Sequence, residues 1–138
     1  MSALPVTGRR PVTGLLWALR VLGAALLAGM GWLHLHLWLD GYRTISVIGP
    51  AFLLNAIAGF GLAVLLLVIP RQLLPCVAAL GALTALGTLG GLLLATTVGL
   101  FGFKESTAAD LWWTSLWLEL AAIVVLAALG ALAVRRRE

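Results

Sequence analysis

The sequence predicts an all-α fold, an integral membrane four-helix bundle with its N and C termini in the cytoplasm. Hydrophobic residues make up 62% of the 138 residues and charged residues only 10%, against about 45–50% and about 25% in soluble domains. A soluble chain this small has too much surface for its volume to hide so many apolar side chains. The apolar residues also fall into four long runs, each about the length that crosses a bilayer.

The first run predicts a helix over residues 15–39, after a flexible cytoplasmic tail over residues 1–14 that is rich in Pro, Gly and Thr. No charged residue occurs from Val21 to Leu39. At about 1.5 Å per residue this stretch spans about 28 Å, close to the thickness of the hydrocarbon core. Arg20 precedes it, where we expect its long stem to reach the lipid headgroups.

The other runs predict helices over about residues 51–69, 76–103 and 111–134, which complete a transmembrane domain over residues 15–134. Pro50 suits the first turn of the second helix because a proline has no N–H to leave unpaired there. Asp110 suits the N-cap of the fourth helix because its carboxylate can accept orphan N–H groups. Residues 135–138 form a basic cytoplasmic tail.

The positive charges predict the orientation. Six basic residues fall on one side of the predicted bundle: Arg9, Arg10, Arg71, Arg135, Arg136 and Arg137. Arg43 and Lys104 fall on the other side. Because loops rich in Lys and Arg stay in the cytoplasm, both termini are expected inside a cell (plasma) membrane. An aromatic belt is expected at the outer surface, formed by Trp38, Tyr42, Trp112 and Trp113.

Small residues predict how the helices pack. In lipid, helices associate through close contacts between small side chains, and residues four apart lie on one face. On the third helix, such residues recur at every fourth position: Gly87, Gly91, Ala95 and Gly99. The second helix contributes Gly59 and the first contributes Gly29. The stripe on the first helix continues to Trp32 and His36. The alternative is chance, since the chain has 16 glycines.

A cluster of polar side chains is expected in the outer half of the bundle. Glu119 is the most unusual member, about 12 Å below the outer boundary, where an unpaired carboxylate is unfavourable by several kcal/mol. We expect it to face the interior, within hydrogen-bonding reach of His36, Asn55, Trp117 or a neighbour such as Ser115. The other candidates at similar depth are His34, His36, Asn55, Asp40, Tyr42, Arg43 and Trp117.

His34 and His36 are not a metal-binding pair, because helical residues two apart point about 200° from each other. His36 is the better interior candidate because it continues the stripe of small residues, and His34 is expected at the headgroup boundary. Each histidine has a structural and a ligand-binding interpretation. Asn55 is expected to form an interhelical hydrogen bond.

The segment HLHLWLDGYRTISVIGPAFLLNAIAG, from His34 to Gly59, resembles a segment of small four-helix membrane proteins of actinobacteria, a group with no assigned activity. The resemblance covers the end of the first helix, the first loop and half of the second helix. It implies the fold and the source and no site. Small multidrug-resistance transporters have a similar size, but their essential glutamate lies in the first helix, and this chain has none there.

The composition and the motifs favour an accessory or interaction protein without enzymatic activity. No phosphate-binding loop, nucleophile elbow, zinc-protease motif or dinucleotide fingerprint occurs. The first alternative is a small-solute or proton-coupled transporter that uses Glu119. The second is a redox protein that holds haem or quinone at His34 or His36, across a dimer. The expected partners are the lipid bilayer and a homodimer or larger membrane complex, with no nucleic acid. No cofactor is predicted, and haem is the least favoured possibility.

Overall fold

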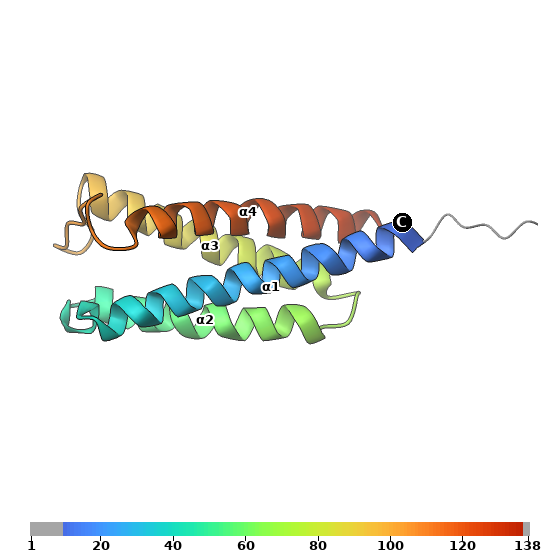
Figure 1. Cartoon of the computed structure of the whole chain (residues 1–138), viewed down its shortest axis with the longest axis horizontal. Coiled ribbons are helices and arrows are strands. Elements are labelled where there is room, and N and C mark those ends of the chain that lie inside the picture. Colours follow the sequence, from blue (N-terminus) through green and yellow to red (C-terminus); the bar gives the residue numbers. More distant parts are fainter. Residues whose placement is uncertain (1–9, 137–138) are drawn as a thin grey trace, which may run out of the picture.

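The computed structural model describes residues 10–136 and confirms the all-α four-helix bundle (Figure 1). The helices are α1 (Arg10–Leu39), α2 (Ile48–Val68), α3 (Leu74–Thr97) and α4 (Trp112–Arg135), with a short 3₁₀ helix, η1 (Tyr42–Thr44), after α1. All four are long and apolar enough to cross a membrane, which makes the chain a multi-pass membrane protein.

Two helix boundaries differ from the predicted ones by five residues or more. α1 begins at Arg10, so residues 10–14 are helical; residues 1–9 and 137–138 of the predicted tails lie outside the described residues. α3 ends at Thr97, not at residue 103, and the chain continues as an irregular loop over residues 98–111. Gly99 and Gly102 in this loop have positive φ angles of 89° and 78°, a conformation that glycine adopts without strain and that a helix cannot contain.

The predicted N-cap of the fourth helix is also wrong. Leu111, not Asp110, occupies the N-cap of α4, in a left-handed conformation with φ of 60°, and no side chain there makes a capping hydrogen bond. The second helix fits its prediction better. α2 begins at Ile48, so Pro50 lies in its first turn as expected.

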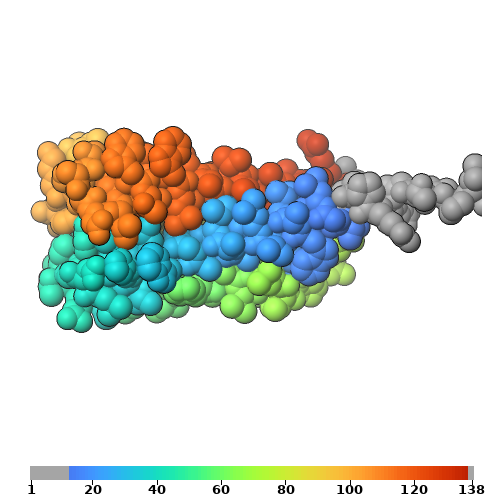
Figure 2. Space-filling view, viewed as in Figure 1, coloured from blue at the N-terminus to red at the C-terminus, as the bar shows by residue number. Residues whose placement is uncertain are grey.

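The four helices run up and down, and three of the four neighbouring pairs pack closely. α1 packs extensively against α2 and α4, and α3 packs against α4, whereas α2 and α3 touch only sparsely. Figure 1 shows the bundle as an α1–α2 pair beside an α3–α4 pair, and Figure 2 shows α1 and α4 meeting on one face. We call the end with η1 and loop 98–111 the loop end, and the opposite end the terminal end.

The closest helix contact joins Gly31 of α1 to Gly59 of α2. A Cβ atom on Gly59 would lie 2.7 Å from the carbonyl oxygen of Leu27 and 2.8 Å from Cα of Gly31. This agrees with the predicted packing role of Gly59, although Gly31 was not predicted. A Cβ atom on Gly29 would meet the Leu118 side chain of α4 at an ordinary contact distance of 3.5 Å.

The predicted packing role of Gly87 and Gly91 on α3 is wrong. A Cβ atom on Gly87 would meet no neighbouring atom of the described chain within 4 Å, and one on Gly91 would meet only the side chain of Leu100, at 3.8 Å. Both glycines line a cavity instead. Ala95 is buried and lines the same cavity, and Gly99 lies beyond the end of α3.

Arg20 is buried at the terminal end and does not extend toward headgroups. Its guanidinium donates hydrogen bonds to the carbonyl oxygens of Leu66 and Ile69 at the end of α2. It also lies over the ring of Trp17, 4.7 Å from the centroid. The last carbonyls of a helix have no partner within it and carry its partial negative charge. Arg20 therefore caps α2 from α1.

Candidate functional site

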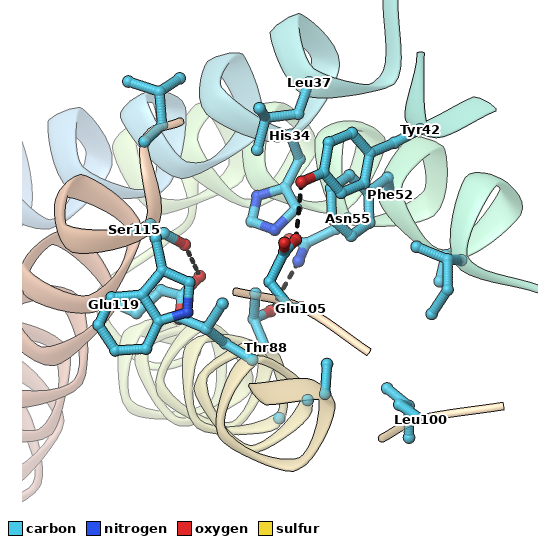
Figure 3. A pocket seen from close by; sticks show the side chains of 18 of the residues that line it. His34, Leu37, Tyr42, Phe52, Asn55, Thr88, Leu100, Glu105, Ser115 and Glu119 are labelled. Carbon is cyan, nitrogen blue, oxygen red and sulfur yellow. Dashed lines mark hydrogen bonds between the residues drawn. The ribbon is translucent and has the colours of Figure 1, made fainter. Parts of the chain in front are cut away.

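A cavity of about 560 Å³ occupies the loop end of the bundle, between α2, α3, α4 and loop 98–111 (Figure 3). Pockets of about 300–1,000 Å³ accept small molecules. Most of the lining is apolar, including Leu37, Phe52 and Leu92. Leu54 of α2 and Leu83 of α3 also line the cavity and are 67% and 63% exposed. The cavity therefore reaches the bundle surface between α2 and α3, the pair that packs least.

Glu119 projects from α4 into this cavity and is only 1% exposed. Its Oε1 accepts a hydrogen bond of 2.7 Å from the Ser115 hydroxyl, four residues earlier on the same helix. Its Oε2 is buried and has no partner among the described residues. The prediction that Glu119 faces the interior and contacts Ser115 is confirmed. One carboxylate oxygen is left for a molecule in the cavity.

Asn55 of α2 has a second unpaired acceptor. Its Nδ2 donates a 2.7 Å hydrogen bond to Oγ1 of Thr88 on α3, as expected for an interhelical bond. The Thr88 hydroxyl donates its own hydrogen to the carbonyl oxygen of Thr84, so it can only accept from Asn55. This fixes the orientation of the amide and leaves Asn55 Oδ1 buried without a partner.

The two histidines lie on opposite faces of α1, and their predicted roles are reversed. His34 is 5% exposed, lines the cavity and donates from Nδ1 to the carbonyl oxygen of Met30 at 2.9 Å. His36 stacks on Trp32 with ring centroids 5.1 Å apart, and its side chain is 40% exposed. The reason is the packing of Gly31 against α2: His34 follows Gly31 by three residues and so shares its face, while His36 does not.

Tyr42 connects the two loops over the cavity. Its hydroxyl donates a 2.7 Å hydrogen bond to Glu105 Oε2 in loop 98–111, and its ring stacks on Phe52 with centroids 4.9 Å apart. The Glu105 backbone N–H binds the carbonyl oxygen of Ala95 at the end of α3, which folds the loop back over the bundle. Burial and the Glu105 carboxylate raise the pKa of Tyr42 well above its usual range.

The predicted polar cluster is therefore only partly assembled. His34, Tyr42, Asn55 and Glu119 line one cavity. Asp40 pairs with His36 outside the cavity at 3.1 Å, and Arg43 and Trp117 are exposed.

Sequence reasoning also missed members of the cavity. The polar ones are Thr84, Thr88, Glu105, Asp110 and Trp112. Trp112 was expected in an interfacial belt, but it is buried and donates to Thr96 Oγ1 at 3.0 Å. Thr84 and Thr88 lie four apart on α3, beside Gly87 and Gly91, and this spacing was the signal available in the sequence. No sequence signal pointed to Glu105, because the sequence does not show that its loop folds back over the bundle.

The titratable side chains of the lining are mostly acidic. Its carboxylates are Glu105, Asp110 and Glu119, and none of the described lining residues is Lys or Arg. Within residues 10–136, no group of three His, Cys, Asp or Glu side chains is placed to hold a metal ion. The cavity suits an organic molecule held by hydrogen bonds and apolar contacts.

No family model, curated protein or solved structure matches this chain. The resemblance to small actinobacterial membrane proteins stays a prediction, and the cavity is the basis for assigning a function.

Proposed function

We propose that this protein binds a lipophilic molecule that carries a polar head and enters from the bilayer between α2 and α3. The observation that carries the proposal is Glu119, which lines a cavity of about 560 Å³ and whose Oε2 is a buried acceptor without a partner among the described residues. A buried acceptor left unpaired is unfavourable by about 1–3 kcal/mol. A ligand whose head donates to this oxygen removes that penalty.

The position of the opening supports the bilayer as the source of the ligand. Leu54 and Leu83 lie beside the opening, Leu83 near the middle of α3 and Leu54 six residues inside α2, and both helices are apolar enough to cross a membrane. A molecule in the acyl-chain region can place its polar head inside while its apolar part stays between the two helices. The Tyr42–Glu105 hydrogen bond ties the loops over the loop end, so the side of the bundle is the more open route.

This function is closest to the predicted alternative of a small-solute carrier, and it also suits an accessory protein that presents a lipophilic molecule to a partner. The haem alternative receives no support. Within one chain, ligation from both sides needs two histidines that face each other, but His34 lines the cavity and His36 stacks outside on Trp32. Ligation across a dimer stays a prediction.

We also propose that the protein resides in the plasma membrane with its termini in the cytoplasm, which places the cavity in the outer leaflet. The excess of basic residues at the terminal end supports this orientation. Reporter fusions after Glu138 and within residues 70–75 should report cytoplasm, and fusions within residues 40–50 or 104–110 should report the exterior. A cytoplasmic signal from residues 40–50 contradicts the orientation.

Photolabelling tests the binding function. The protein in phosphatidylcholine nanodiscs is irradiated with a dodecanol that carries a diazirine on its chain, and the labelled residues are mapped by mass spectrometry. We expect labels on the cavity lining, including Leu54 and Leu83. Gly87→Leu should strongly reduce them, because its side chain occupies open space in the cavity.

Gly61→Leu is the matched control. Gly61 also has open space around it, but it does not line the cavity, so labelling should persist. Labels that spread evenly over lipid-facing residues such as Val124, or that Gly87→Leu leaves unchanged, would show that the cavity is not a binding site.

A further inference from the structure

Two residues that line the cavity carry buried acceptor atoms without a partner in the described chain. Glu119 Oε2 and Asn55 Oδ1 are the buried side-chain atoms without a partner among the described residues. Most donors of the lining are already used, and the Asn55 amide, which has two N–H groups, donates one of them to Thr88. The hydroxyl of Ser115 binds Glu119, the hydroxyl of Thr88 binds the Thr84 carbonyl, and the indole N–H of Trp112 binds Thr96.

This inventory selects the head group of the ligand. A carboxylate or phosphate head has no hydrogen to donate when ionised, so it would leave both acceptors unpaired. An alcohol donates a single hydrogen. A protonated amine has up to three N–H donors, so it can serve acceptors on different helices. Glu119 and Asn55 project into the cavity from α4 and α2 (Figure 3).

The charged side chains of the lining also favour a cationic head group. Glu105, Asp110 and Glu119 are acidic, His34 is the one basic side chain, and no Lys or Arg is present among the described lining residues. Charges interact far more strongly in apolar surroundings than in water. An anionic head would meet carboxylates with no cation to balance it, whereas a cationic head would meet its counter-charge at Glu119.

We infer that the ligand is a lipophilic primary or secondary amine whose protonated nitrogen donates hydrogen bonds to Glu119, with Asn55 as a second acceptor. This inference rests on the proposed binding function and adds the chemical class of the ligand. The amine's apolar group lies along the apolar lining toward the opening between α2 and α3. Glu105 is not the primary partner, because its two carboxylate oxygens already accept from Tyr42 and from the Ser106 backbone.

Matched probes test the head group. Dodecyl diazirine probes that differ only in the head, as primary amine, trimethylammonium, alcohol or carboxylate, are compared in nanodiscs of neutral phosphatidylcholine. We expect the amine to label the cavity at a concentration about tenfold lower than the trimethylammonium and alcohol probes need. A hydrogen bond to a charged group is more favourable than a neutral one by about 1.4 kcal/mol, which corresponds to a tenfold difference in affinity. The carboxylate should label it least.

Glu119→Gln should abolish the preference for the amine while the alcohol still labels the cavity. Glutamine keeps an acceptor for Ser115, and circular dichroism with size-exclusion chromatography checks that the variant is folded. Asp40→Asn is the control for general charge, because Asp40 is an exposed carboxylate at the same end of the bundle that does not line the cavity. It should keep the amine preference.

The outcomes separate the two proposals. If all probes label the cavity equally, or if the carboxylate is preferred, the amine assignment is wrong and the binding function stands. If the amine preference survives Glu119→Gln, Glu119 is not its partner. If no probe labels the cavity, both proposals are wrong.

Discussion

Replacement of Gly59 and of Gly87 by alanine should have opposite effects on stability, although both glycines lie within helices. Alanine is favoured over glycine in a helix by about 0.8–1 kcal/mol. At Gly87 the new methyl group meets no neighbouring atom of the described chain within 4 Å. Gly87→Ala should therefore be neutral or stabilise the protein by up to about 1 kcal/mol.

At Gly59 the same methyl group would lie 2.7 Å from the Leu27 carbonyl oxygen and 2.8 Å from Gly31, whereas ordinary contact begins at 3.4 Å. α1 and α2 must then separate by about 0.7 Å, since the obstructing atoms are backbone atoms. Overpacking of this kind is unfavourable by about 1–3 kcal/mol. After the gain in helix propensity, Gly59→Ala should destabilise the protein by up to about 2 kcal/mol.

Thermal unfolding in detergent, followed by circular dichroism, measures both variants. On the scale known for soluble domains, 1 kcal/mol shifts Tm by about 2–6 °C, so Gly59→Ala should lower Tm by several degrees while Gly87→Ala leaves it unchanged or higher. If Gly87→Ala is as destabilising as Gly59→Ala, α3 packs tightly against its neighbours and the cavity described here does not exist.

Three further measurements have defined outcomes. Tyr42 is the only tyrosine of the chain, so absorbance should show no tyrosinate near the usual tyrosine pKa of about 10. Because the pKa of Tyr42 is raised in the folded protein, the stabilising effect of the neutral phenol is complete below about pH 10 and is lost as the pH rises further. A normal titration would contradict the buried Tyr42–Glu105 bond. Arg20→Met should destabilise the protein by about 1–3 kcal/mol by unpairing the last carbonyls of α2, whereas Arg71→Met at the same end should change thermal stability little; equal losses would refute the cap. His34→Ala should lower Tm clearly and His36→Ala only slightly, and the reverse order would place His36 inside.

The number and the approximate extents of the helices follow from the sequence, because four uncharged runs of bilayer length leave few other folds. The end of α3 could not be predicted in the same way. Leu100, Phe101 and Phe103 continue the apolar run beyond Thr97, so hydropathy gives no sign of the loop. The chain leaves the helical conformation with positive φ angles at Gly99, Phe101 and Gly102, and glycine is also common inside membrane helices.

The rotation of each helix about its axis could not be predicted reliably. Small residues occur on several faces of α1, so the sequence does not distinguish the stripe of Gly29 and Trp32 from the face of Gly31. The structure uses Gly31, which lies against the backbone of α2 beside Gly59. That single contact decides which histidine is buried. Glu119 was identifiable, since a carboxylate deep in an apolar helix needs a partner wherever it points.

Native mass spectrometry tests the central claim, that the cavity holds one lipophilic amine, most directly. The purified protein is incubated with dodecylamine, transferred to the gas phase and compared with its Gly87→Leu and Gly61→Leu variants. We expect a single bound amine per chain in the unaltered protein and in Gly61→Leu, and much less in Gly87→Leu, whose side chain takes up part of the cavity. The same adducts on all three proteins, or a broad series of adducts on each, would contradict a specific site between α2 and α3.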